Sequence, residues 1–329
     1  MTVRVIGDGP AAAILVGVLR AEQQEVVWAP GDDGLLKILR RRKEIRLILP
    51  WGWLIAGGYR LSSSALLKTG ELGVAVRQPS GRSGVSPSLG AVGGRDKTLL
   101  VLDHPHEPGG GGGLKRAIVA GTAVINGLSL FDAVEWDAGV VEVHSPRPTL
   151  FLAAAAVLQP LSRCLEARKI AVTEVKDPAP FGNALNIRDL LALPVALCHS
   201  TPDNFLSYAE GREIAVSLLE EGLQLYAHAG LPLAKLPNRD PRELLQRLKR
   251  KPGEFDKGRT APDRAYGKAL RCILDGEAKA AREPHDRIVR MASQTGIDPR
   301  WNWAIGEKVN HAIRVGFFRD PVELYNSLR

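Results

Sequence analysis

A glycine-rich turn near the start of the chain has the residue types and spacing of a nucleotide-binding motif. Residues Gly7-Asp8-Gly9-Pro10-Ala11-Ala12 fit G-x-G-x-x-G/A between the apolar run Val3–Ile6 and a helical pattern. Gly7 permits a tight turn, Gly9 lets a pyrophosphate approach the backbone, and the helix N-terminus faces the anion. The motif predicts dinucleotide binding by these six residues. The alternative is a strand-to-helix turn that binds nothing.

The end of the second apolar run, Glu25–Ala29, should distinguish between dinucleotides. An acidic side chain there binds the ribose 2′-hydroxyl, whereas a basic one accommodates a 2′-phosphate. The sequence instead continues as Pro30-Gly31, with Asp32 and Asp33 just beyond and a basic run at 40–43. The aspartates fit equally well as caps of a helix, and the basic run as its solvated end. The pattern therefore leaves NAD and NADP both open.

A second polar segment, Asp103-His104-Pro105-His106-Glu107, follows an apolar run at 99–102. Loops at this place in an α/β sheet meet the ligand, so Asp103 is a candidate cofactor contact, with a plain surface loop as the alternative. Two histidines in one loop are too few ligands for a metal, and no metal site is expected. The three cysteines are far apart and odd in number, which excludes a disulfide framework and indicates a reducing cytoplasm.

The elements that must position these residues divide the chain in two. Short apolar runs indicate strands at 3–6, 25–29, 46–49, 72–76, 99–102, 117–125 and 140–144, with the spacing of an α/β sheet. Proline and glycine punctuate 176–182, and the patterns beyond are helical, at 186–197, 211–228, 241–251, 265–281, 284–295 and 301–315. The sequence predicts an α/β Rossmann-type doubly wound sheet over residues 1–177, followed by an all-α domain over 178–329.

Composition narrows the partners. The 329 residues are 45% hydrophobic and 24% charged, as in ordinary globular proteins. The net charge of +8 produces only a weak electrostatic field over a chain of this length. The basic cluster Lys249-Arg250-Lys251 has no interleaved aromatic residue on which bases could stack. No nucleic-acid partner is therefore expected. The longest apolar run, 150–158, is too short to cross a bilayer, so no membrane partner is expected. An anionic cofactor and an anionic small-molecule substrate fit the charge best.

Nearly the whole chain resembles the ketopantoate reductase family. The resemblance is carried by GDGPAA with Glu25-Val26, by the run Gly73–Arg77, by Ala138–Val141 and by Lys268–Ile297. It implies a Rossmann domain joined to a helical domain like that of 6-phosphogluconate dehydrogenase, hydride transfer to a 2-oxo acid, and a homodimer. It also adds Arg77 to the expected cofactor contacts and slightly favours NADP.

The functional residues of that family are largely replaced in this sequence. The family's lysine falls on Leu185, and its two asparagines fall on Asp189 and Leu193. Its serine falls on Gly267 or Lys268, and its glutamate falls near Ala280. The family's cofactor-binding arginine falls on Gly31. A leucine cannot stabilise charge developing on a carbonyl oxygen. The catalytic residues therefore stay unknown. We expect Arg188, Asp189, Lys268 and Arg271, on the interdomain cleft, to bind the substrate.

Two functions are compatible with these residues. The first is an NAD(P)-dependent oxidoreductase, ketopantoate reductase-like, acting on a small anionic oxo or hydroxy acid or on an imine. The second is a catalytically inactive NAD(P)-binding protein, either a redox sensor or a partner subunit. Cofactor binding is expected in both, and turnover only in the first.

Overall fold

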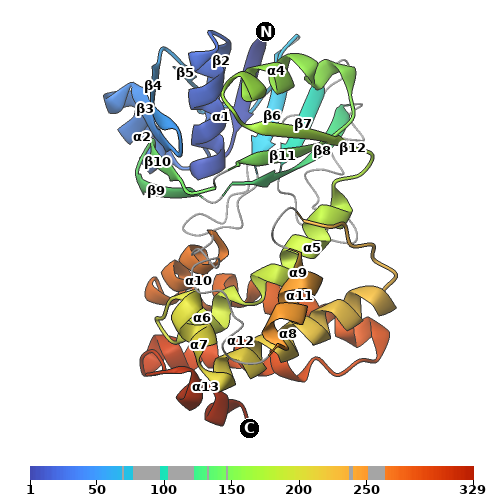
Figure 1. Cartoon of the computed structure of the whole chain (residues 1–329). Helices are drawn as coiled ribbons and strands as arrows, with labels where there is room; N and C mark the ends of the chain where they lie inside the picture. Colours follow the sequence, from blue (N-terminus) through green and yellow to red (C-terminus); the bar gives the residue numbers. More distant parts are fainter. Residues whose placement is uncertain are drawn as a thin grey trace. The chain divides into compact units, whose positions relative to one another are not determined.

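The computed structural model describes residues 1–68, 70–76, 97–102, 122–131, 133–145, 147–236, 240–250 and 264–329. The chain forms two compact units, Met1–Pro178 and Ala179–Arg329 (Figure 1). Each unit has its own cluster of buried apolar side chains. The first combines strands and helices, and the second is helical wherever regular structure is described. This agrees with the α/β and all-α classes predicted from the sequence.

The main sheet of the first unit has eight strands among the described residues. In chain order they are β1 (Thr2–Ile6), β2 (Glu25–Ala29), β5 (Arg60–Leu61), β6 (Leu72–Val76), β7 (Thr98–Leu102), β8 (Ala123–Leu130), β11 (Thr149–Ala153) and β12 (Ala171–Val175). Their order across the sheet is β12-β11-β8-β7-β6-β1-β2-β5. From β5 to β8 every neighbouring pair is parallel. Numbered along the chain, these six strands have the order 3-2-1-4-5-6 of a doubly wound dinucleotide-binding sheet, which confirms the predicted fold class.

Four further strands form a separate sheet. They are β3 (Glu44–Leu49), β4 (Gly52–Gly57), β9 (Ala133–Asp137) and β10 (Val140–Val143), in the order β4-β3-β10-β9. The runs at 46–49 and 140–144 were expected in the main sheet, and that expectation was wrong. Each belongs to an antiparallel hairpin with a two-residue connection, β3 with β4 and β9 with β10. A parallel sheet needs long crossover connections, so tight hairpins pair among themselves instead.

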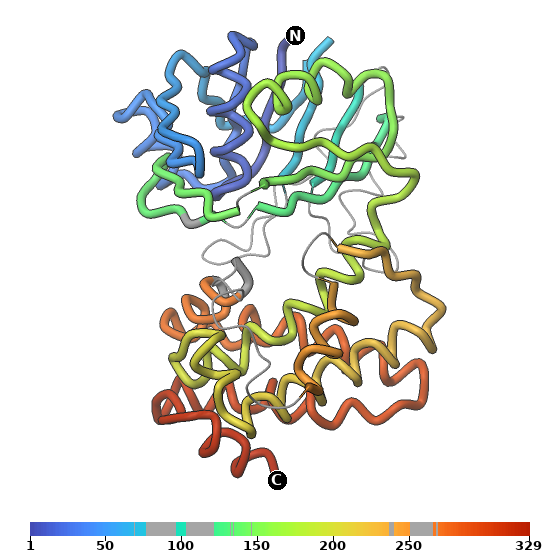
Figure 2. Tube along the Cα trace, viewed as in Figure 1, coloured from blue at the N-terminus to red at the C-terminus, as the bar shows by residue number. Residues whose placement is uncertain are grey.

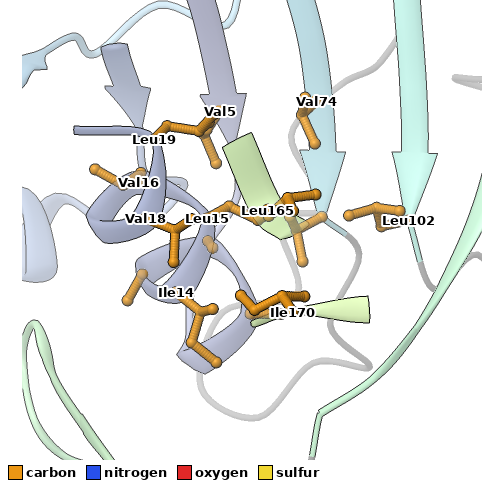
Figure 3. Close-up of a cluster of buried hydrophobic side chains, with 14 of the residues drawn as sticks. Val5, Ile14, Leu15, Val16, Val18, Leu19, Val74, Leu102, Leu165 and Ile170 are labelled. Atoms are coloured by element: carbon orange, nitrogen blue, oxygen red, sulfur yellow. The ribbon is translucent and has the colours of Figure 1, made fainter. Parts of the chain in front are cut away.

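Helix α1 (Pro10–Ala21) holds the main sheet and the glycine-rich turn together. Proline at its first turn fixes the helical φ where no intrahelical N–H is needed. Residues 11–19 are all buried. Figure 3 shows Ile14, Leu15 and Val18 among side chains from β1, β6 and β7, with Leu165 and Ile170 beside them. The other helices described in this unit are α2 (Asp33–Arg42), the short 3-10 helix η2 (Ala156–Leu158) and α4 (Gln159–Ala167).

The second unit consists of helices packed around α8. Figure 2 shows the chain of this unit, from α5 to the C-terminus, where the trace is red. Its described helices are α5 (Ala179–Asp189), α6 (Ala192–Leu197), α7 (Pro202–Ser207), α8 (Ala209–His228), α9 (Pro241–Leu248), α10 (Arg264–Leu274), α11 (Ala278–Thr295), α12 (Arg300–Arg314) and α13 (Pro321–Leu328). Helix α8 contacts α5, α7, α9, α11, α12 and α13. None of the helices in the described ranges is long and apolar enough to cross a membrane.

Two helix boundaries differ from the predicted ones. The pattern at 186–197 is two helices, since the chain turns at Leu190 and Leu191 between α5 and α6. The break predicted before Pro284 lies earlier, at Gly276, whose φ of 74° ends the helical path after α10. Pro284 lies inside α11. Burial of α11 along α12 offsets the hydrogen bond that proline cannot donate.

Candidate functional site

The glycine-rich turn lies where the strand order of the main sheet reverses. Strand β1 has β2 on one side and β6 on the other, and Gly7 directly follows it. Ligands of open α/β sheets bind in the crevice at this point, beyond the carboxyl ends of the strands. The amide of Gly7 donates to Ala29 O over 3.0 Å, and Trp28 Nε1 donates to Gly7 O over 2.9 Å. These bonds fix the turn to the end of β2.

The backbone of the turn requires glycine at two positions. Gly7 has φ 117°, and a Cβ there would lie 2.4 Å from the carbonyl oxygen of Val76 at the end of β6. Gly9 has φ 83° and ψ −173°, a region that is essentially restricted to glycine. Side chains at either position would hold the neighbouring backbone or a ligand away. The structure therefore keeps the turn close to both adjacent strands.

The N-terminus of α1 has unused hydrogen-bond donors. Pro10 has no N–H, and the amide of Ala13 donates to Gly9 O over 3.0 Å as the first intrahelical bond. The amides of Ala11 and Ala12 therefore have no intrahelical acceptor, and no side chain caps the helix. Free amides and the positive end of the helix dipole together bind anions. These donors, with the bare backbone of Gly9, fit a dinucleotide pyrophosphate.

Asp8 connects this turn to the next one. Its Oδ1 accepts hydrogen bonds from the amide of Gly31 over 2.8 Å and from that of Asp32 over 3.4 Å. Burial raises the pKa of Asp8, although the two amide bonds oppose the shift. The sequence pattern treats Asp8 as a variable position of the motif, so only the fold shows that its carboxylate holds the turn after β2.

Two of the predicted cofactor contacts, Arg77 and Asp103, lie outside the described residues and stay predictions. The substrate candidates lie on two helices. Arg188 and Asp189 end α5, where Arg188 is nine-tenths buried and its Nη2 is 3.8 Å from Asp189 Oδ1. Lys268 and Arg271 lie three residues apart on α10, and the Arg271 side chain is exposed. Helix α5 packs on α8 and α9, whereas α10 packs mainly on α6 and α11.

Four of the positions that replace the family's functional residues, Leu185, Leu193, Gly267 and Ala280, are apolar or lack a side chain. Leu193 is 1% exposed and belongs to the core of the second unit. Leu185 and Ala280 are half-buried. Gly267 is exposed, and a Cβ at this position would meet no atom within 4 Å. None of these four residues offers a side-chain proton donor, acceptor or charge.

Burial makes the thiol of Cys198 unreactive. Cys164, Cys198 and Cys272 are all buried thiols. Burial, with the nearby carboxylates of Asp320 and Glu323, raises the pKa of Cys198 to about 12, although this residue lines a cavity of about 330 Å³ with His199. A thiol with such a pKa stays protonated at neutral pH and is a poor nucleophile. Among the described residues no group of three or more His, Cys, Asp or Glu side chains could hold a metal ion.

A buried polar cluster in the second unit joins three helices. Glu221 of α8 accepts hydrogen bonds from the amide of Trp301 (2.7 Å) and from the amide and side chain of Asn302 (3.0 and 2.8 Å) at the start of α12. Asn302 Oδ1 lies 2.9 Å from Nδ1 of His285 on α11, which is fully buried. Burial lowers the pKa of His285 to about 4, against the opposing effect of its bond to Asn302. We assign this cluster a structural role.

Within this cluster, burial of His285 predicts a loss of stability in acid. The unfolded chain takes up a proton on His285 near pH 6.5, whereas the folded protein does so only near pH 4, so stability falls as pH decreases between these values. The expected loss from this residue is about 3 kcal/mol at pH 4. Urea unfolding at pH 7 and pH 4 measures it. The variant His285→Gln should reduce the pH dependence, and His228→Gln, an exposed control, should not.

Comparisons with known proteins agree on the fold. No family model and no curated protein sequence matches the chain. Solved structures do match. A PanE/ApbA family ketopantoate reductase from Ralstonia eutropha JMP134 has a TM-score of 0.73 at 14% identity, covering 100% of both chains. A 2-dehydropantoate 2-reductase from Methylococcus capsulatus has a TM-score of 0.69 at 15% identity, covering 94% of this chain and 96% of that one.

D-mandelate dehydrogenase is also similar, in a ternary structure with NADH and anilino(oxo)acetate. Its TM-score is 0.69 at 11% identity, covering 100% of this chain and 99% of that one. Identities this low establish a shared fold. The chain thus has the fold of ketopantoate reductases and of D-mandelate dehydrogenase over its whole length, which confirms the resemblance drawn from the sequence at the level of architecture.

Proposed function

We propose that the chain binds a nicotinamide dinucleotide, NADP or NAD, on the turn Gly7–Ala12. We further propose that it is an oxidoreductase transferring hydride to or from a small anionic oxo or hydroxy acid or an imine. The observation that carries the proposal is the uncapped N-terminus of α1 after a glycine turn, at the point where the strand order reverses. The similar folds of two reductases and a dehydrogenase support it.

The residues of the turn would bind and orient the cofactor, and the nicotinamide would supply or accept the hydride. The amides of Ala11 and Ala12 would donate to the pyrophosphate, which the backbone of Gly9 lets approach. Arg188, Lys268 and Arg271 are the proposed cations for the carboxylate or carbonyl oxygen of the substrate, with Asp189 beside Arg188. A cation near that oxygen would stabilise the negative charge that develops as hydride arrives.

Cofactor binding without catalysis is the second candidate. It is favoured by the burial of Leu193 in the core and by the apolar Leu185, because neither position can contribute to proton transfer. Such a protein would bind the dinucleotide saturably and show no turnover. A reaction that is lost in Arg188→Gln, Asp189→Asn or Lys268→Gln while cofactor binding is retained would exclude this candidate.

A thermal-shift titration with NADH and NADPH tests the cofactor proposal. At least one dinucleotide should raise the melting temperature of the native protein in a saturable way, since a ligand that binds only the folded state stabilises it. Gly9→Asp should weaken binding by more than about tenfold, because a carboxylate would occupy the space of the pyrophosphate and repel it.

The matched control is Ile38→Asp, which adds the same charge to the exposed face of α2. Its binding should equal that of the native protein. If neither dinucleotide binds the native protein, both candidate functions are wrong. If Gly9→Asp binds as tightly as the native protein, the cofactor site is elsewhere.

A further inference from the structure

The backbone amides of the turn between β2 and α2 already donate hydrogen bonds to a carboxylate. The amides of Gly31 and Asp32, which could have bound an anion, donate to Asp8 Oδ1. In doubly wound folds this turn binds the adenosine ribose, and a basic side chain there accommodates a 2′-phosphate. Here Ala29, Pro30 and Gly31 provide no such side chain.

The backbone amides at the N-terminus of α2 are also bound by a carboxylate. Asp32 Oδ1 accepts from the amides of Gly34 (2.6 Å) and Leu35 (3.0 Å), so the first free donors of this helix are used internally. Asp33, exposed in the first turn, adds a further negative charge. Four backbone amides of this segment are thus bound to two aspartates, and a phosphate would meet negative charge in place of donors.

The cations of α2 do not compensate for these carboxylates. Arg40, Arg41 and Arg42 lie in its last turn, about 12 Å along the axis from Asp32. Arg42 is bonded to Ala138 O and forms an ion pair with Asp137. Lys37, one turn into the helix and exposed, is the cation of this helix nearest to the turn in sequence.

A ribose hydroxyl suits this surface better than a phosphate. Both amide bonds to Asp8 end on Oδ1, and no hydrogen bond within the described structure uses its Oδ2. A carboxylate oxygen accepts a hydrogen bond from a hydroxyl. A 2′-phosphate would bring about −1.5 to −2 charges at pH 7 beside Asp8 and Asp32.

We infer that the chain selects NAD(H) over NADP(H), and that Asp8 and Asp32 are the residues that make the selection. The inference rests on the proposed function, since it concerns the dinucleotide bound by the turn Gly7–Ala12. It also departs from the slight preference for NADP that the family resemblance implies.

Separate titrations with NADH and NADPH at pH 8 test the inference. The native protein should bind NADH at least about tenfold more tightly than NADPH. In the double variant Asp8→Asn/Asp32→Asn, the side-chain oxygens of the asparagines can still accept the same hydrogen bonds from the backbone amides. The turn and the helix cap should therefore persist while the negative charges are lost. The dissociation constant of NADPH divided by that of NADH should then fall by about tenfold.

Two further measurements separate charge from structure. Lys37→Gln should leave the preference for NADH intact, and 0.5 M KCl should reduce it in the native protein because salt screens exposed charges. Melting temperatures of both variants show whether they fold. Equal or tighter binding of NADPH by the native protein, or an unchanged ratio in a folded Asp8→Asn/Asp32→Asn variant, would overturn the inference and leave the proposed function standing. Binding of neither dinucleotide would instead contradict the proposed function.

Discussion

Replacing Glu71 by leucine should lower the free energy of unfolding by about 3–5 kcal/mol, because Arg4 would be left as an unpaired buried charge. Arg4 lies on β1, and its Nε and Nη2 donate to the Glu71 carboxylate over 2.8 and 3.3 Å. Both side chains are about 95% buried. Arg4 Nη1 also donates to Ser64 O, so the pair anchors the segment before β6 to the strand that precedes the glycine turn.

Urea unfolding followed by circular dichroism measures this loss. The control is Glu25→Gln, which removes the partner of Arg60 in an exposed ion pair and should cost less than about 1 kcal/mol. The double variant Arg4→Leu/Glu71→Leu should recover much of the loss, because an apolar pair has no charge to desolvate. A Glu71→Leu protein as stable as the native one would show that Arg4 reaches water or another partner.

Local sequence patterns were sufficient for the elements that carry the candidate site. The apolar run before Gly7, the proline at the start of α1 and the glycines at 7 and 9 each act within a few residues, and the observed strand, turn and helix have the expected order. The order of strands in the main sheet could not be obtained in this way. Whether the run at 46–49 joins the main sheet or a hairpin depends on pairing with β4 and with residues almost a hundred positions away.

Elements with weak local patterns were missed. Strand β12 at the edge of the main sheet is largely exposed, so its residues do not alternate as a half-buried strand would. The apolar run at 150–158 contains both β11 and η2, and its composition alone cannot separate them. The bonds from Gly31 and Asp32 to Asp8 join positions 23 and 24 residues apart. Only the adjacency of β1 and β2 brings these groups together, so local sequence patterns could not reveal these bonds.

Gly7→Ala should be the most damaging substitution in the candidate site. The new Cβ would lie 2.4 Å from Val76 O at a backbone φ of 117°, which side chains rarely adopt. Strain of about 1–3 kcal/mol from the dihedral angle adds to a similar cost of overpacking, so we expect the free energy of unfolding to fall by about 4 kcal/mol. Relief requires β1 and β6 to separate or the turn to move, and either change displaces the amides of Ala11 and Ala12.

Thermal unfolding with and without NADH measures both consequences. The matched control is Gly182→Ala in α5, where a Cβ meets no atom within 4 Å. This substitution should stabilise the protein by about 0.5–1 kcal/mol, because alanine has the higher helix propensity. A Gly7→Ala protein that retains native stability but loses NADH binding would indicate that the turn moves while the sheet holds. If both properties were retained, Val76 would have to shift freely, and the close contact between β1 and β6 at this turn would not be a requirement for cofactor binding.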